Sequence, residues 1–421
     1  MKVSMIGLGY IGLPTAAVLA SKNIDIIGID VKADVVNTIN RGEIHIVEPA
    51  LEAMVTDAVK CGKLRASLKP ETADIFMIAV PTPFKNNHEP DISYVEAAAL
   101  SIAPVLEKGN IVLLESTSPV GTTEMLAKLL AEKRKDLSFP GCNNSTQELP
   151  DIAIAYCPER VLPGNIIHEL VNNDRVIGGL TPSCTQKAAE FYKLFVQGKC
   201  LLTDARTAEM CKLTENTFRD VNIAFANELS IIADHLHINV WELINLANHH
   251  PRVNILKPGP GVGGHCIAVD PWFIVHSSPE QAKLIRMARE TNDNKPKYVI
   301  NQIKEIVRRI NKNIEDISIA TLGLAFKANI DDLRESPAVE IAKMITDMGF
   351  KYHYIAEPNI STLPKILIHK QNLLEQAESA INKAEIVVLL VDHDEFLKID
   401  KAVLTGKYVV DTRGAWNDIY R

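Results

Sequence analysis

The first thirty residues, MKVSMIGLGYIGLPTAAVLASKNIDIIGID (1–30), decide the fold of the N-terminal part of this chain. The apolar runs over 2–6 and 24–29 predict two strands, and 14–21 between them predicts a buried helix. A strand, a helix and a second strand in so short a stretch form one βαβ unit. The sequence therefore predicts an α/β domain built on a parallel sheet.

A glycine motif, GLGYIG (7–12), lies between the first strand and the helix. Gly7 permits the tight turn, Gly9 lets the backbone approach a pyrophosphate, and Gly12 lets helix and strand pack closely. Asp30 ends the second strand, where a carboxylate binds a ribose 2′-hydroxyl and repels a 2′-phosphate. These residues predict NAD binding, with a structural turn or a flavin site as the alternatives.

The alternation of strands and helices continues beyond this unit. Further strands are predicted at 75–80, 111–114 and 152–155, helices at 94–107 and 122–135, and a loop insertion at 136–150. Apolar residues at helical spacing then predict one long helix from 204 to 237, with a second face available to another subunit. The C-terminal part returns to strands at 317–322, 351–355, 386–391 and 408–410, with helices at 337–348 and 372–383.

We therefore expect two Rossmann-like doubly wound α/β domains joined by a long central helix. The chain has 421 residues, 47% of them apolar and 23% charged, which is typical of a multidomain globular enzyme. Its net charge of −7 argues against a general nucleic-acid surface. The seven cysteines lack Cys-x-x-Cys spacing, which predicts reduced thiols. The sequence has no apolar run long enough to predict a membrane anchor, so we expect a cytoplasmic protein.

One cysteine lies in an unusual loop, GPGVGGHCIAVDP (259–271). Glycine and proline at this density are unfavourable inside helices and strands, so the loop is expected to present Cys266, with Asp270 four residues later. A nucleophilic thiol combined with a nicotinamide cofactor favours oxidation through a covalent thiohemiacetal and thioester.

Other candidate residues have two interpretations each. Lys212, Asn216 and Arg219 share a stripe of the long helix, which is either a functional face or a solvated one. Glu159 beside Arg160 is either a proton-transfer residue or half of an ion pair, and the ion pair is favoured.

Four further segments lie beside predicted strands or the cysteine loop. The adjacent pair His249-His250 lacks a third metal ligand, so we expect no metal and favour phosphate or sugar contacts by His250 and Arg252. In 326–337, Ser336-Pro337 fits a helix start, while Lys327 and Arg334 favour a second diphosphate. The segments 79–83 and 115–121 are equally consistent with ligand loops and ordinary turns.

Together these motifs resemble the UDP-glucose/GDP-mannose dehydrogenase family over essentially the entire chain. The resemblance rests on GGHC (263–266), EMCKLTEN (209–216) and FKANIDDLRESP (326–337). The stretches NRGEIHIVEP (40–49), AYCPERVLPG (155–164) and HPRVNIL (250–256) are most similar to members that oxidise UDP-N-acetyl-D-mannosamine. UDP-glucose or UDP-N-acetylglucosamine 6-dehydrogenation remains open, as do a one-step hydroxyacid dehydrogenase and a nonenzymatic NAD-binding regulator.

The resemblance implies three domains: an NAD domain at 1–203, a helical dimerisation domain at 204–300 and a UDP-sugar domain at 301–421. It implies a homodimer in which Arg252 reaches the neighbouring site. The implied reaction is a four-electron, NAD-dependent oxidation of the sugar's carbon-6 alcohol to a carboxylate, for bacterial surface polysaccharide.

The resemblance also implies roles for individual residues. The catalytic set comprises the nucleophile Cys266, with Lys212, Asn216, Asp270 and Glu159. The cofactor set, besides the three glycines of the motif, comprises Tyr10, Ile11, Asp30, Thr82, Thr117 and Thr123. The UDP-sugar set comprises Arg160, Val161, Lys212, Asn216, Arg219, His250, Arg252, Gly263, Phe326, Lys327, Arg334 and Arg413.

Overall fold

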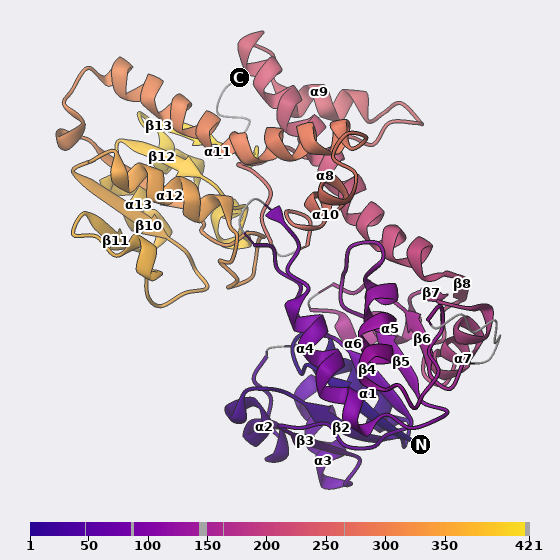
Figure 1. Ribbon diagram of the computed structural model, residues 1–421. Helices are drawn as coiled ribbons and strands as arrows, with labels where there is room; N and C mark the ends of the chain where they lie inside the picture. The colour runs from indigo at the N-terminus through magenta and orange to yellow at the C-terminus, as the bar shows by residue number, and fades with distance from the viewer. Residues whose placement is uncertain (47, 86–87, 143–149, 163, 265, 417–421) are drawn as a thin grey trace. The chain divides into compact units, whose positions relative to one another are not determined.

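The computed structural model describes residues 1–46, 48–85, 88–142, 150–162, 164–264 and 266–416 (Figure 1). It divides into two compact units, Met1–Glu215 and Asn216–Arg421. Of the loop expected at 136–150, residues 143–149 lie outside the described part. No helix among the described residues combines the length and the apolar character needed to cross a bilayer.

The first unit is built on one eight-stranded sheet with the order β3-β2-β1-β4-β5-β6-β7-β8. All neighbouring strands are parallel except β6 and β7. The strands are β1 (Lys2–Ile6), β2 (Asp25–Ile29), β3 (Leu64–Ser67), β4 (Ile75–Ile78), β5 (Ile111–Leu114), β6 (Ala153–Tyr156), β7 (Arg175–Gly179) and β8 (Cys200–Asp204). The order reverses between β1 and β4, which is where doubly wound sheets bind ligands.

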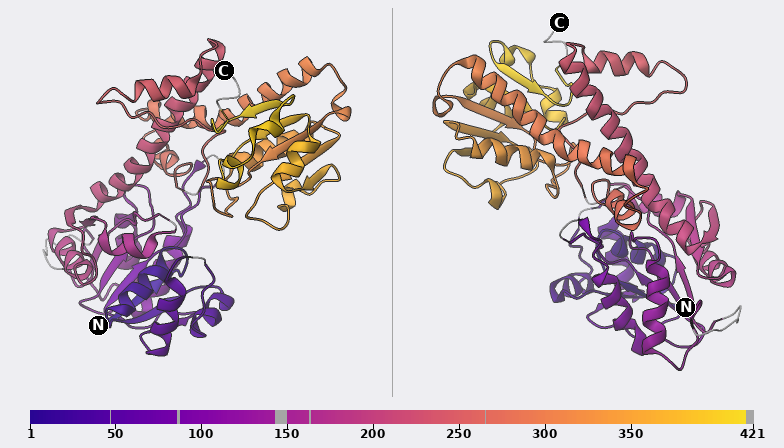
Figure 2. Two further views of the ribbon diagram at one scale, coloured as in Figure 1. Left: turned by 180° about the vertical axis from the view of Figure 1, so that it is seen from behind. Right: turned by 45° about the horizontal axis from the view of Figure 1, so that its top comes forward.

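Helices cover both faces of this sheet and bury a separate apolar core on each (Figures 1 and 2). One face carries α1 (Gly12–Ser21), α2 (Ala33–Asn40), α3 (Leu51–Lys60), α6 (Ile166–Asn172) and α7 (Pro182–Tyr192). The other carries α4 (Ser93–Ile102), the 3₁₀ turn η2 (Ala103–Val105) and α5 (Thr122–Lys133). The doubly wound architecture expected for this part of the chain is confirmed.

The second unit contains a five-stranded parallel sheet with the order β11-β10-β9-β12-β13. Its strands are β9 (Ser318–Leu322), β10 (Tyr352–Ala356), β11 (Asn372–Leu374), β12 (Ile386–Leu389) and β13 (Tyr408–Asp411). One face packs against α11 (Lys283–Ile310) and α12 (Pro337–Asp347), the other against α13 (Ala377–Lys383) and α14 (Asp394–Leu397). The second Rossmann-like sheet is therefore confirmed.

Figure 2 shows the long helix α8 (Ala205–His235) as one unbroken rod; it contains the boundary between the units. It is followed by α9 (Val240–Ala247) and α10 (Asp270–Ser277). The single-helix prediction for 372–383 is wrong at its start, because Asn372–Leu374 pairs with β10 as an edge strand before α13 begins. The 28-residue α11 was not predicted.

Candidate active site

The turn after β1 has the geometry that a pyrophosphate site requires. Gly7 has φ +94° and donates its amide to the Ile29 carbonyl at 2.8 Å. A Cβ on Gly12 would lie 1.9 Å from the Gly7 oxygen, so α1 can start this close to the turn only with glycine there. A Cβ on Gly9 would meet nothing within 4 Å, which leaves open space beside its backbone. The turn therefore fits a dinucleotide, whose phosphates would bind at the N-terminus of α1.

Asp30 stands at the carboxyl end of β2, beside this turn. Its carboxylate accepts the amides of Leu8 at 3.2 Å and Lys32 at 2.9 Å, and the residue is half-buried. Sequence reasoning missed His45, whose imidazole lies close to the Asp30 carboxylate and the Leu8 backbone. Burial lowers the pKa of His45, and the charge of Asp30 opposes that effect.

The three threonines assigned to the cofactor site differ in their surroundings. Thr82 and Thr117 follow β4 and β5 and are partly exposed at the same sheet edge. Thr123 is fully buried, and its hydroxyl donates to a carboxylate oxygen of Glu209 at 2.6 Å. Glu209 also accepts the amides of Gly121 and Thr123, so it fastens the first turns of α8 to the N-terminus of α5. Thr123 thus serves this contact, while Lys212 lies one turn further along α8.

Glu159 belongs to a buried ion pair, but its partner is not the neighbouring arginine. The guanidinium of Arg175, at the start of β7, donates to the Glu159 carboxylate at 2.7 Å, and both side chains are buried. Arg160 instead pairs with Glu215 of α8 at 2.7 Å. The expected ion pair is therefore present, but its partner is Arg175 and not the arginine adjacent in sequence.

A second carboxyl lies beside this pair. Glu115, directly after β5, is buried and accepts a hydrogen bond from the Tyr192 hydroxyl at 2.8 Å. Its other oxygen has no hydrogen-bond partner among the described residues. Burial, reinforced by the charge of Glu159 and opposed by Arg175, raises the pKa of Glu115 to about 7. Sequence reasoning missed this carboxyl, because Glu115 looked like part of a turn.

The cysteine loop of the second unit joins three predicted catalytic residues. Cys266 is exposed, and its carbonyl accepts the amides of Val269 at 3.1 Å and Asp270 at 2.9 Å. That tight turn delivers the buried Asp270 to the first position of α10. The amide group of Asn216 on α8 donates to the Asp270 carboxylate at 2.5 Å. Asp270 thereby connects the cysteine turn to α8, on the helix face that also carries Lys212 one turn earlier.

The same loop packs against residues assigned to the UDP-sugar set. A Cβ on Gly263 would lie 2.4 Å from the Glu335 oxygen and 3.0 Å from the Phe326 side chain, so glycine is needed for this close approach. Gly259 lies against the guanidinium of Arg413, which pairs with Asp392 at 2.8 Å. The segment that follows β9 and the end of β13 therefore meet at the cysteine loop.

The other basic candidates lie on the surface. Lys327, Arg334, Arg219, His250 and Arg252 are all exposed, and Arg334 pairs with Asp332 at 2.7 Å. The Arg252 amide donates to the His250 ring at 3.3 Å, within the turn after α9. Val161 is half-buried and packs on the apolar core of the first unit.

Asp220, the neighbour of Arg219 on α8, is fully buried and pairs with Arg289 of α11. The solvated face, one of the two interpretations of this stripe, therefore does not extend to Asp220, because α11 covers that side of α8. Arg219 is exposed, in agreement with the same interpretation.

The fold and the loops define the class of this protein: an α/β enzyme with a dinucleotide-type domain, a glycine-rich loop that exposes Cys266 and a second nucleotide-type domain. The family models of the UDP-glucose/GDP-mannose dehydrogenase family match in chain order: the NAD binding domain at 1–196, the central domain at 206–294 and the UDP binding domain at 320–418. The chain belongs to the UDP-glucose/GDP-mannose dehydrogenase family, whose members are NAD-dependent oxidoreductases.

Individual relatives are similar over nearly the full length. The chain is 59% identical to a UDP-N-acetyl-D-mannosamine dehydrogenase of Escherichia coli K12, covering 98% of this chain and 99% of the relative. It is 58% identical to an NDP-N-acetyl-D-galactosaminuronic acid dehydrogenase of Ralstonia nicotianae, covering 99% and 96%. A solved UDP-D-ManNAc dehydrogenase from Pyrococcus horikoshii superposes with a TM-score of 0.87 at 37% identity, covering 99% and 96%.

Proposed function

We propose that this protein oxidises UDP-N-acetyl-D-mannosamine at carbon-6 to UDP-N-acetyl-D-mannosaminuronate, consuming two NAD. The observation that carries the proposal is the cysteine turn, in which Cys266 is presented next to Asp270 and Asn216 on a loop that packs against Phe326. The relatives named for UDP-N-acetyl-D-mannosamine support the choice of sugar. We further propose the domain limits 1–203, 204–300 and 301–421, a cytoplasmic location and a role in bacterial surface polysaccharide synthesis.

The chain's own residues have distinct tasks in this reaction. The Gly7–Gly12 turn would hold NAD, with Asp30 on its ribose, and the bound cofactor would supply the acceptor for the hydride lost from carbon-6. The Cys266 sulfur bonds to carbon-6 at the aldehyde level, and Lys212 and Asn216 stabilise the oxyanion that forms. A second NAD would take up the hydride lost from the resulting thiohemiacetal, which leaves a thioester on Cys266. Water then cleaves the carbon–sulfur bond and releases the carboxylate and the thiol. Asp270 and Glu159 assist proton transfer in these steps.

The proposal includes a homodimer, in which Arg252 contacts the substrate of the partner. Its support is a row of exposed apolar side chains on α8 at seven-residue spacing: Phe218, Phe225 and Ile232, exposed by 68%, 52% and 44%. Side chains seven apart lie on one face of a helix, and such a face is stabilised by a second apolar surface. Sedimentation of the wild type and of Phe225→Glu tests this assembly; a wild-type monomer would contradict it.

The decisive experiment counts NADH formed per nucleotide sugar consumed. Oxidation of an alcohol to a carboxylate removes four electrons and yields two NADH, a one-step dehydrogenase yields one, and a regulator yields none. UDP-N-acetyl-D-mannosamine, UDP-N-acetylglucosamine and UDP-glucose are compared at equal concentration. UDP-N-acetyl-D-galactosamine is included as the second candidate substrate, because the Ralstonia relative is named for the N-acetyl-D-galactosaminuronic acid configuration. Faster oxidation of another sugar would overturn the substrate assignment while leaving the reaction class intact.

Replacing the nucleophile provides the test of mechanism. We expect Cys266→Ser to reduce carboxylate formation by about a thousandfold or more, because a hydroxyl is a far weaker nucleophile toward the aldehyde. Steady-state carboxylate production is measured, and NAD affinity serves as the control for folding, since the NAD site lies in the other unit. Normal turnover by this variant would exclude covalent catalysis by Cys266.

A further inference from the structure

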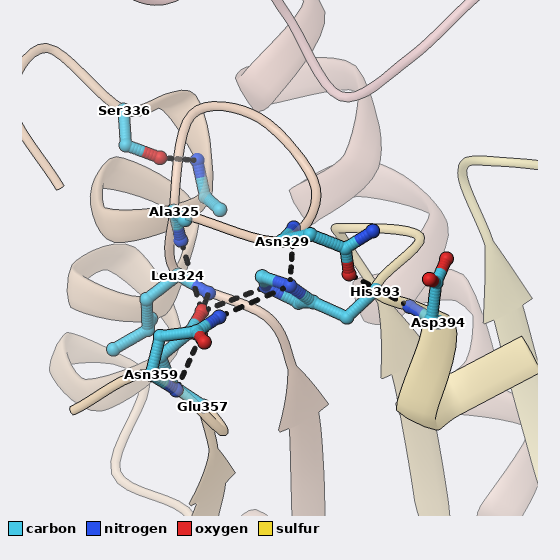
Figure 3. A network of polar contacts seen from close by, with 9 residues as sticks. Leu324, Ala325, Asn329, Ser336, Glu357, Asn359, His393 and Asp394 are labelled. Carbon is cyan, nitrogen blue, oxygen red and sulfur yellow. Dashed lines mark hydrogen bonds and ion pairs between the residues drawn. The ribbon is translucent and has the colours of Figure 1, made fainter. Parts of the chain in front are cut away.

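The segment 323–336, which connects β9 to α12, is fixed at both of its ends (Figure 3). At its start, the amides of Leu324 and Ala325 donate to one carboxylate oxygen of Glu357, at 2.7 and 3.1 Å. At its end, the Ser336 hydroxyl accepts the amide of Ala338 at 3.2 Å and caps α12. Between these points the Phe326 amide donates to the Asp332 carbonyl at 3.1 Å, and an anchor from outside the segment holds its middle.

That anchor is His393, which follows β12. Its Nδ1 accepts the backbone amide of Asn329 at 2.9 Å, and the Asn329 side-chain oxygen accepts the Asp394 amide at 3.0 Å (Figure 3). Asn329 has φ +63°, a left-handed conformation that is uncommon among non-glycine residues and that asparagine adopts more readily than most. The two hydrogen bonds to the 393–394 backbone and ring hold the residue in it.

The pattern of donors defines the state of the imidazole. Nδ1 faces the N–H of Asn329 and, at 3.4 Å, the amide group of Asn359, so Nδ1 is the acceptor. The ring proton therefore lies on Nε2, which donates to Glu357 at 3.1 Å. Both His393 and Glu357 are buried, and the ring of Phe396 meets the imidazole edge-on. Burial would raise the pKa of Glu357, but His393 and the two amides hold it below its ordinary value.

We propose that the Glu357–His393 pair is a positioning device for the nucleotide sugar: through Asn329 it fixes Phe326 and Lys327 where the diphosphate and uridine bind. The inference rests on the proposed function, in which these two residues contact UDP. It is supported by the packing of Phe326 on Gly263, because any displacement of 323–336 also displaces the loop that carries Cys266. His393 touches neither substrate nor cofactor in this scheme.

Two substitutions of His393 separate its two hydrogen bonds. In His393→Gln, the side-chain amide reaches the Nε2 position and retains a donor for Glu357, but the acceptor for Asn329 is lost. In His393→Asn, the side-chain oxygen occupies the Nδ1 position and retains that acceptor, but the donor to Glu357 is lost. The two variants thus differ in whether they retain the hydrogen bond to the Asn329 amide, which is the contact that the proposal requires.

UDP binding by calorimetry is the first readout, because it involves neither chemistry nor the sugar. We expect His393→Gln to weaken UDP binding about tenfold, the equivalent of one lost hydrogen bond, and His393→Asn to remain within threefold of wild type. NAD affinity is expected to stay unchanged in both. Equal UDP affinity in His393→Gln and wild type would overturn the inference. Equal losses in the two variants, together with lower unfolding temperatures, would assign His393 to packing alone and would also overturn it.

Hydrogen exchange in the ligand-free protein distinguishes this inference from the proposed function. Exchange of amides in 323–336 is expected to accelerate about tenfold in His393→Gln and to remain slow in His393→Asn. A wild type that does not bind UDP, with this exchange pattern present, would refute the proposed function and leave the anchoring of Asn329 intact. Unchanged exchange in His393→Gln would refute the anchoring even if UDP binds.

Discussion

The two sheets contain the same turn after their first strand. The carboxylate beside the turn is partly exposed in one sheet and buried in the other. Gly7 and Gly323 follow the first strand of each sheet, with φ +94° and +95°, and each donates its amide at 2.8 Å to the carbonyl that ends the neighbouring strand. Asp30 and Glu357 stand next to those carbonyls. Asp30 is half-buried and faces a tight turn, whereas Glu357 is buried and saturated by amides and His393.

The difference follows from what lies between turn and helix. In the first unit α1 begins at Gly12, so the turn is short and its carboxylate remains accessible to a ligand. In the second unit α12 begins only at Pro337, and the long segment 323–336 needs an internal anchor. The same strand-end carboxylate is therefore accessible to a ligand in one sheet and a structural group in the other.

The largest expected effect comes from breaking the short turn. Gly12→Ala places a Cβ against the Gly7 oxygen, and we expect it to cost about 3 kcal/mol of the first unit's stability. Calorimetry of the full chain measures this loss. Gly9→Ala is the matched control: its Cβ meets nothing, so the unit should unfold as in wild type while NAD binding weakens. Equal stability of the two variants would contradict the role given to Gly12.

The next effect tests the saturated carboxylate. Glu357→Gln turns one carboxylate oxygen into an amide group. Its hydrogens then oppose either the donors from Leu324, Ala325 and His393 at one oxygen or the Asn359 amide at the other. We expect a loss of about 2 to 3 kcal/mol in the unfolding free energy of the second unit, with NAD affinity unchanged. A variant as stable as wild type in calorimetry would show that the carboxylate's charge and acceptors are not needed there.

The parts of the fold that were predictable are those in which burial follows the apolar pattern. The strands at 2–6 and 111–114 were placed to the residue, since central parallel strands are buried on both faces and read as continuous apolar runs. The helix α11 was missed because its buried face contains Arg289, Asn292 and Lys295. It also contains Pro296, a residue that usually ends a helix. The three polar side chains are buried because they pair with residues of α8, and no periodicity of apolar residues in the sequence indicates that burial.

The site shows the same limit. The Cys266 loop with Asp270 was predictable, because its glycine- and proline-rich composition marks it, whereas Asn216 was joined to these residues only by the family resemblance. The Glu357–His393 pair was not, because its partners come from different strands and neither residue lies in a motif. Likewise Glu115 and Arg175 meet only after β5, β6 and β7 have assembled.

Glu115 can be compared with Glu357, because both carboxyls are buried but, within the described part of the chain, Glu115 lacks the backbone amides and the histidine that donate hydrogen bonds to Glu357. Its pKa of about 7 in the folded protein exceeds the ordinary 4.5, so the folded state retains the proton between these values and stability falls as the pH rises through that window. We expect Glu115→Gln to stabilise the first unit by about 2 kcal/mol at pH 8 and by almost nothing at pH 5. Thermal unfolding at the two pH values measures this. The exposed Glu124→Gln should show no such dependence, and a loss of stability at both pH values in Glu115→Gln would refute the assignment.

The smallest expected effect concerns the ligand carboxylate itself. Asp30→Asn retains an acceptor oxygen for the Leu8 amide, so stability should remain within about 0.5 kcal/mol of wild type. The charge that attracts the ribose hydroxyls and repels a 2′-phosphate is lost, however. We expect NAD affinity to fall about tenfold and NADP affinity to rise, as measured by titration of both cofactors. A variant that lost stability but retained its cofactor preference would give Asp30 the structural role of Glu357 and remove the contrast between the two turns.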